Sequence, residues 1–183
     1  GGRAQVFNVK GFKHDAGPTV ITAPFMFDEL FNLFGENREN YLKFVALDPW
    51  YRFYFYDKSS FDYCRTVQDT KLEIKKFSKN DAEGYEKLLK ISKDIFDIGF
   101  TQLSDKPFNS FWFMCKQIPA LIKLKAHLTV SQLVGRYLKN SKIRSAFSIH
   151  PLLVGGNPFN TTSIYALIHY LERNWGVYFC LGG

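Results

Sequence analysis

The sequence pattern changes near Ser78, and this change limits the fold more than any other feature. Before it, residues 5–14 alternate loosely, and residues 42–63 are rich in Phe and Tyr, as strands often are. After it, apolar residues recur every three or four positions from Tyr85 to Leu103, which predicts a helix with one buried stripe. A strand pattern returns near the C-terminus in "GVYFC". A sheet that opens early and resumes after a helical block predicts an α/β or α+β fold.

The first part of the chain also contains boundary signals. Lys10-Gly11 is a suitable hairpin turn between two short strands. Pro24 suits the first turn of a helix and Gly35 its end, so "FMFDELFNLF" is expected to be helical. The segments "YLKFVAL" and "WYRFYFY", with a short strand after them, are expected to be neighbouring antiparallel strands that share one aromatic face. The expected order is therefore strand, helix and three strands.

The block that follows is expected to contain several helices. Residues 109–126 are helical in pattern but interrupted near Pro119, and residues 129–150 predict one or two further helices. The last helix, "SIYALIHYLERNW", would be capped by Thr161 or Thr162. It leads directly into the final strand.

The net charge of +7 arises in one segment. Residues 106–171 contain no Asp or Glu and carry their cations among bulky apolar residues. Such a composition suits a helix that lies among the headgroups of an anionic membrane. A solvated basic face over an ordinary core explains the same charge, and nucleic acid is a weaker explanation because no recognition motif is present. The cations are Lys106, Lys116, Lys123, Lys125, Arg136, Lys139, Lys142 and Arg144.

The cysteines and histidines show neither the spacing of a metal site nor that of a disulfide framework. Isolated, reduced thiols favour a compartment that faces the cytosol, and no metal is expected. A carboxylate that acts as a general base would come from residues 1–105, from Glu172, or from outside this chain. The residues concerned are Cys64, Cys115, Cys180, His14, His127, His150 and His169.

Two segments are not explained by packing alone. In "HDAGPTVIT", Gly17-Pro18 closely follows Asp15, and in "VGGNPFNTT" a Gly-Gly-Asn-Pro turn precedes a capped helix. Glycines permit close approach of the backbone or positive φ angles, and a helix N-terminus offers free N–H donors. Each segment alone is more typical of a tight turn, whereas the two together suggest a common ligand.

These segments also carry a resemblance to a known family. The stretches "GGRA", "FKHDAGPTVIT", "LLVGGNPFNTTSIYALIHYLERNWGVYF" and the closing "GG" are similar to bacterial-type phytoene desaturases. These are flavoprotein carotenoid oxidoreductases related to amine oxidases. Weaker similarities, "NDAEGYEKLL", "KPFNSF" and "IPALIKLKAH", occur between them in the same order. The resemblance therefore covers essentially the whole chain.

The resemblance implies an FAD cofactor and an internal fragment of a longer flavoprotein. The strand, GxGxxG turn and helix that bind the ADP part of FAD would precede the chain, and the closing "GG" would introduce a later helix. The fragment alone is accordingly not expected to hold FAD or to be active. By analogy, Gly1, Gly2 and Arg3 would lie along the cofactor, and Asp15, Gly17, Pro18 and Thr19 would lie close to its isoalloxazine.

The resemblance leaves the catalytic residues open. After "KPFNSF", bacterial relatives often carry an acidic and a basic residue, whereas the matching stretch here contains Phe113 and Lys116. No acid–base pair is therefore carried over, and Lys116 alone is a candidate. Substrate-binding residues are expected in the second segment, at Val154, Gly155, Asn157 and Tyr165.

The resemblance also divides the chain into parts. Residues 1–23 would belong to a Rossmann-like FAD-binding domain, and residues 24–77 would form a substrate-side helix and antiparallel sheet. Residues 78–150 would form an inserted, helical and basic subdomain associated with the membrane. Residues 151–183 would return to the flavin and substrate domain.

The family's reaction suits this composition. The expected function is FAD-dependent desaturation of phytoene or a related polyene, in which a hydride passes to the flavin and a proton leaves a neighbouring carbon. An aromatic content of 17 % would help to bury such a hydrocarbon. We expect a peripheral protein on the cytoplasmic side of a membrane, without a nucleic-acid partner and of unspecified oligomeric state. The alternatives are a carotenoid isomerase or ketolase and a non-catalytic module that binds lipid or membrane.

Overall fold

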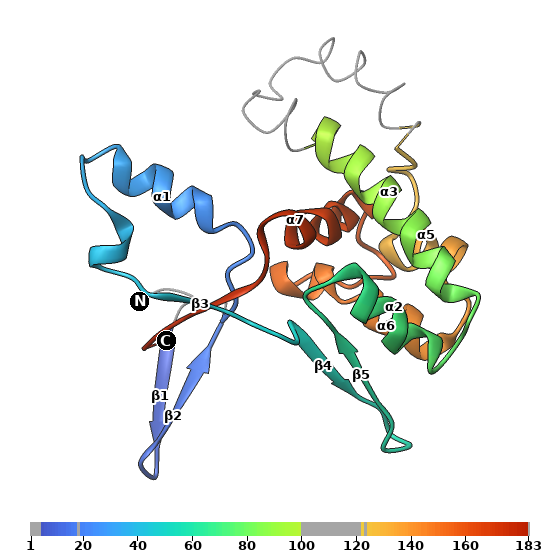
Figure 1. Ribbon diagram of the computed structural model, residues 1–183, viewed down its shortest axis with the longest axis horizontal. Coiled ribbons are helices and arrows are strands. Elements are labelled where there is room, and N and C mark those ends of the chain that lie inside the picture. Colours follow the sequence, from blue (N-terminus) through green and yellow to red (C-terminus); the bar gives the residue numbers. More distant parts are fainter. Residues whose placement is uncertain (1–4, 18, 100–121, 123, 183) are drawn as a thin grey trace.

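The computed structural model describes residues 5–17, 19–99, 122 and 124–182. Figure 1 shows two regions, a thin wing that carries both described ends of the chain and a thicker helical body. The wing consists of β1 (Gln5–Val9), β2 (Phe12–Ala16), α1 (Pro24–Asn32), η1 (Arg38–Asn40), β3 (Phe44–Ala46) and β6 (Tyr178–Cys180). The body consists of β4 (Tyr51–Tyr54), β5 (Ser60–Tyr63), α2 (Val67–Lys75), α3 (Asp81–Gly99), α5 (Val130–Tyr137), α6 (Ser141–Phe147), η2 (His150–Val154), η3 (Ser163–Ala166) and α7 (Leu167–Trp175).

Most of the expected elements are present in the described part of the chain. The hairpin turns at Lys10 and Gly11, both with positive φ, and α1 begins with Pro24 in its first turn. Residues 129–150 form the two helices α5 and α6, and Thr162 caps η3, which continues into α7. The mixture of helices and strands agrees with an α/β flavoprotein domain. The expected helix around Pro119 falls outside the described residues.

The strand pairing corrects one expectation. All three described sheets are antiparallel pairs, namely β1 with β2, β4 with β5, and β3 with β6. We expected the strands of residues 42–63 to be neighbours, but Phe44 pairs with Cys180, far along the chain. The backbone N–H of Leu47 then donates to Val177 O at 2.9 Å, so the partner of this segment is the C-terminal strand. The expected aromatic face does form between β4 and β5, where Phe53 stacks on Phe61 at 5.9 Å between ring centroids.

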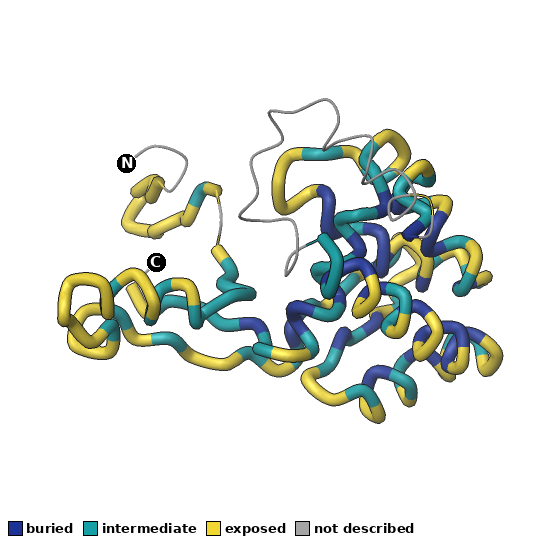
Figure 2. Tube along the Cα trace, turned by 90° about the horizontal axis from the view of Figure 1, so that it is seen from above, coloured by how far each residue is buried: buried dark blue, intermediate teal, exposed yellow. Residues whose placement is uncertain are grey.

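The core lies entirely in the body. Figure 2 shows the buried residues gathered there, whereas the wing is exposed or intermediate along its length. Phe147 is the centre of an aromatic cluster, with ring centroids 5.0 Å from Tyr85 and 5.1 Å from Tyr63. Such pairs add to the free energy of burial because ring edges and faces attract.

Two buried polar contacts tie the helices of the body together. Asp81 begins α3, and its carboxylate accepts hydrogen bonds from the backbone N–H groups of Lys139 and Asn140 at 2.9 and 2.8 Å. Arg173 on α7 donates to the hydroxyl of Tyr85 at 2.7 Å and lies over the ring of Trp50 at 4.3 Å. These contacts join segments that the sequence separates widely. Among the described residues, no helix has both the length and the apolar composition needed to cross a bilayer.

Candidate functional site

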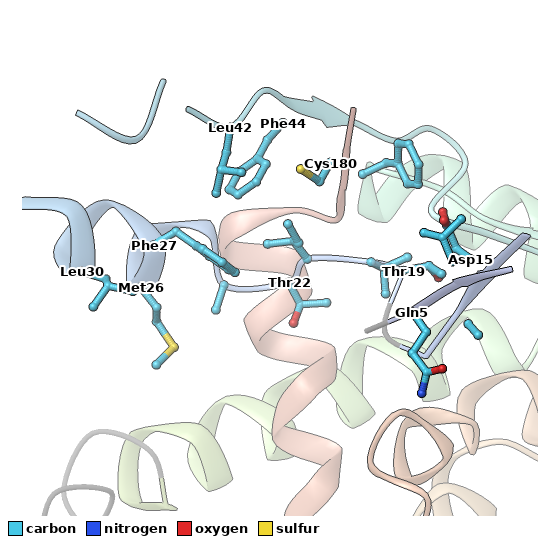
Figure 3. A pocket seen from close by; sticks show the side chains of 16 residues that line it. Gln5, Asp15, Thr19, Thr22, Met26, Phe27, Leu30, Leu42, Phe44 and Cys180 are labelled. Atoms are coloured by element: carbon cyan, nitrogen blue, oxygen red, sulfur yellow. The ribbon is translucent and has the colours of Figure 1, made fainter. Parts of the chain in front are cut away.

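A large apolar cavity of about 820 Å³ lies in the wing, between β2, α1 and the β3–β6 pair. Figure 3 shows Met26, Phe27 and Leu30 at one end and Asp15 and Thr19 at the other. Asp15 is the one charged side chain among the described residues that line it. The cavity thus has a long hydrophobic wall with a polar end, which suits an apolar ligand that is fixed at one point.

A second cavity of about 720 Å³ adjoins the first and shares Thr19, Val20 and Thr22 with it. One wall is made by Gly17 and Thr19, after β2. The opposite wall is made by residues 152–155, from η2 and its cap. The fold therefore brings together the two segments that the sequence analysis singled out.

Only some of the predicted cofactor and substrate residues line the two cavities. Gly17 and Thr19, predicted to contact flavin, line the second cavity with Val154 and Gly155, predicted to contact substrate. Asp15 lines only the first cavity of these two. The predicted residues Gly1, Gly2, Arg3, Pro18 and Lys116 lie outside the described residues.

Asn157 and Tyr165 serve other contacts in the described part of the chain. The side chain of Asn157 accepts a hydrogen bond from the backbone N–H of Phe159 at 2.9 Å, within its own turn. Tyr165 packs against the hydrophobic core of the body. Their role toward a substrate stays a prediction.

The backbone at the second cavity suits a planar ring. Gly17 and Gly155 have φ of 105° and 76°, a region that side chains other than Gly rarely adopt. A Cβ atom added at Gly155 would meet nothing within 4 Å, so the surface there is open. Apolar walls, an open glycine and the hydroxyl of Thr19 fit an isoalloxazine, which is flat and polar only along one edge.

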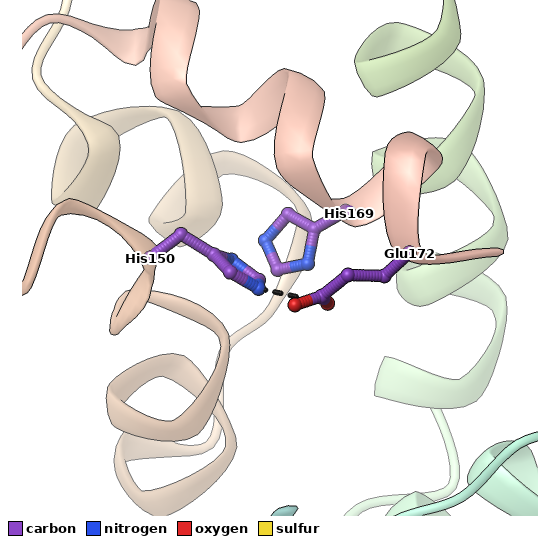
Figure 4. Close-up of side chains that lie close together, drawn as sticks. All are labelled: His150, His169 and Glu172. Atoms are coloured by element: carbon purple, nitrogen blue, oxygen red, sulfur yellow. Dashed lines mark hydrogen bonds and ion pairs between the residues drawn. The ribbon is translucent and has the colours of Figure 1, made fainter. Parts of the chain in front are cut away.

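A group of titratable side chains lies buried in the body. Figure 4 shows His150 from η2 facing His169 and Glu172 from α7. Their possible ligand atoms all lie within 4.8 Å of one another. Glu172 accepts from the hydroxyl of Tyr51 at 2.7 Å and contacts His150 Nε2 at 2.9 Å, and His169 Nε2 donates to Phe147 O at 3.0 Å.

This group was missed in the sequence because only part of it is local. His169 and Glu172 are three residues apart on a helix and hence share a face. His150 and Tyr51 reach them only through the tertiary fold. Burial penalises the imidazolium and holds the pKa of His169 well below its ordinary value, and His150 adds to this. Burial and the neighbouring Glu172 likewise raise the pKa of Tyr51, so its hydroxyl stays protonated and donates.

Comparison with protein families shows which family the chain belongs to. The model of flavin-containing amine oxidoreductases matches residues 1–183. The chain belongs to this family. The resemblance to amine-oxidase-related flavoproteins is thereby confirmed, and FAD is the cofactor implied for the protein.

Several curated relatives align with the whole chain. It is 44 % identical over 183 residues to "Phytoene desaturase (lycopene-forming)" of Pseudescherichia vulneris and to the enzyme of the same name from Pantoea ananas. It is 32 % identical to "Phytoene desaturase (neurosporene-forming)" of Cereibacter sphaeroides. The aligned part is 100 % of this chain but only 35–37 % of each relative. The chain thus spans little more than a third of the length of these relatives.

Proposed function

We propose that this chain forms the flavin- and substrate-facing part of an enzyme that desaturates phytoene or a related long polyene in carotenoid biosynthesis. The observation that carries the proposal is the second cavity, which Gly17 and Thr19 line together with Val154 and Gly155. The names of the relatives, all 100 % matched along this chain, support the same substrate class.

The apolar walls account for substrate binding. A polyene offers nothing to hydrogen-bond, so its affinity comes from burial of apolar surface at about 25 cal/mol per Å². Met26, Phe27 and Phe44 supply such surface along the first cavity. When bound, FAD supplies the hydride-accepting chemistry of the reaction.

The residues at the junction of the cavities orient the reactants. Gly17, Thr19 and Gly155 leave room for a flat ring and offer a hydroxyl to fix it. Walls of this kind also exclude water from the reacting carbons. Asp15 lies at the polar end of the first cavity, where a carboxylate orients a polar group of the cofactor.

Reconstitution tests the proposed reaction. The full-length protein, supplied with FAD and liposomes that contain phytoene, should yield polyenes that absorb at longer wavelength and have lost two hydrogens for each new double bond. An isomerase would give products of unchanged mass, and a ketolase would add oxygen. A preparation that binds FAD stoichiometrically yet leaves phytoene unchanged would refute the proposal, and the reaction without FAD is the control.

We also propose that the protein attaches to a membrane surface from its cytoplasmic side. An exposed basic patch, defined by Arg136, Lys139 and Arg144, supports this because anionic headgroups attract such clusters. Vesicle flotation should show stronger binding to anionic than to neutral lipid. Changing all three residues to Gln should remove this difference, whereas equal flotation of the unmodified protein with both lipids would contradict the proposal.

A further inference from the structure

Within the described part of the chain, the backbone hydrogen bonds of the wall made by residues 152–155 are all local. The wall belongs to η2 and its cap, and only His150 and Pro151 of η2 are buried. Leu152, with 61 % of its surface exposed, is exposed like the two residues after it. The position of the wall therefore depends mainly on how the first two residues of η2 are held.

Within itself the wall is a compact unit. The backbone N–H of Leu152 donates to Ile149 O at 2.8 Å, and that of Gly155 donates to Leu152 O at 3.0 Å. The N–H of Gly156 closes the turn by donating to Pro151 O at 2.8 Å. Because these bonds are local, they fix the shape of the wall but not its place relative to the rest of the body.

The side chain of His150 connects the wall to the rest of the body. Its Nε2 atom lies 2.9 Å from Glu172 Oε2, and Glu172 is itself fully buried on α7. The other carboxylate oxygen accepts the hydroxyl of Tyr51 on β4 at 2.7 Å. Tyr51 on β4 thus fixes the carboxylate of Glu172 on α7 by a hydrogen bond, and this carboxylate in turn fixes the ring of His150.

The tautomer of His150 follows from the surroundings of its two ring nitrogens. Nδ1 is buried and has no hydrogen-bond partner among the described residues. A proton there would be a buried donor without a partner, whereas a proton on Nε2 points at a carboxylate oxygen of Glu172, which accepts. The hydrogen therefore belongs on Nε2, and His150 donates to Glu172.

We propose that His150, oriented by Glu172 and Tyr51, is a positioning residue that sets the place of the cavity wall at residues 152–155. It acts through the wall rather than by contact with substrate. The inference rests on the proposed function, since it assigns this wall to the binding of the polyene opposite Gly17 and Thr19.

The structure offers a matched control. His169 is equally buried, its ring centroid lies 4.0 Å from that of His150, and its Nε2 donates to Phe147 O instead of to Glu172. His169→Gln therefore disturbs the same region without touching the link to η2. His150→Leu removes the link, and His150→Gln keeps an N–H donor at similar reach.

The first measurement is hydrogen exchange in the full-length protein. In His150→Leu, the amides of Leu152, Gly155 and Gly156 should exchange about tenfold faster, because the wall loses its hydrogen bond to the core. In His169→Gln these amides should exchange as in the unmodified protein. Unchanged exchange in His150→Leu would overturn the proposal, whatever the enzyme does with phytoene.

The second measurement is the kinetics of the same variants with phytoene in liposomes. His150→Leu should raise KM about fivefold or more with a smaller change in kcat, and His150→Gln should restore much of the loss. Faster exchange with unchanged KM would show that the wall does not position the substrate. A full-length protein that desaturates nothing would refute the proposed function alone, because hydrogen exchange still reports the link.

Metal analysis distinguishes the hydrogen-bonded link from a buried metal centre formed by the same side chains. The purified protein should contain no stoichiometric zinc or other transition metal, since hydrogen bonds already occupy both oxygens of Glu172. One bound metal per chain that disappears in both His150→Leu and His169→Gln would overturn the hydrogen-bond account and assign a buried metal centre.

Discussion

The wing and the helical body are built in opposite ways. None of the described residues of the wing is buried, and Leu33 and Phe34, directly after α1, expose large apolar side chains. In the body, α3 alone buries eight residues. The body encloses its own core, whereas the wing has apolar surface available to line cavities. The comparison teaches that this fold separates the region that encloses a core from the region that lines the large apolar cavity.

The largest expected effect is the difference in the free energy of unfolding that results when a Phe is changed to Ala in the body and in the wing. Phe147→Ala in the body should lower the free energy of unfolding by about 3–5 kcal/mol, because it empties the centre of the aromatic core. Phe34→Ala in the wing, where the side chain is 78 % exposed, should change it by less than about 0.5 kcal/mol. Urea denaturation measures both, and similar losses would break the distinction between wing and body.

The next effect concerns the polar link between α3 and α5–α6. Asp81→Ala should lower the free energy of unfolding by about 2–4 kcal/mol, because the backbone N–H groups of Lys139 and Asn140 lose their acceptor. Asp94→Ala, on the exposed face of the same helix, is the control and should change little. A small loss in Asp81→Ala would mean that apolar packing alone holds these helices.

A smaller effect depends on pH and is confined to the body. His169 stays neutral when folded because its pKa lies well below 6.5, whereas in the unfolded chain it takes a proton near pH 6.5. Stability is thus fully present above that pH and falls below it, by up to about 1.4 kcal/mol per pH unit. His169→Gln should flatten the fall in melting temperature over the unit just below pH 6.5. An equally steep fall in the variant would contradict this assignment.

The smallest effect lies on the surface of the body. The ammonium of Lys142 lowers the pKa of the Asp57 carboxyl from 3.8 to about 2 by a hydrogen bond. The pair therefore stabilises the fold above about pH 4 and stops doing so as the pH falls toward 2. Lys142→Met should remove a small part of the loss of stability at acid pH. Added salt should reduce the difference between this variant and the unmodified protein, because it screens the pair. Lys58→Met, beside the pair, is the control, and equal acid curves for Lys142→Met and the unmodified protein would argue that the pair contributes nothing.

Local patterns predicted the elements of both regions. The apolar stripe from Tyr85 onward predicted α3, Pro24 predicted the start of α1, and Lys10-Gly11 predicted the first hairpin turn, whereas α1 ends at Asn32, earlier than the expected stop at Gly35. Each signal lies within one element, so it can be recognised in the sequence without knowledge of the tertiary fold. The pairing of β3 with β6 has no such signal, because their residues meet across most of the chain.

The site was predictable only in part. The sequence drew attention to Gly17 and Gly155 as unusual turns, and the resemblance supplied their ligand. It could not show that both turns line one cavity. The link from Tyr51 through Glu172 to His150 was invisible for the same reason, since its members are brought together by packing of the body.

The account rests on one cavity between the wing and the wall at residues 152–155, with the flavin against Gly17 and Thr19 and the polyene between the flavin and the wall. Flavin fluorescence in the full-length protein tests this most directly, because an indole stacked near an isoalloxazine quenches it. Val154→Trp places an indole on the wall, and Leu33→Trp places one on the exposed end of α1 as a control. We predict strong quenching in Val154→Trp and none in Leu33→Trp. Equal fluorescence in the two variants, at equal flavin content, would contradict the account.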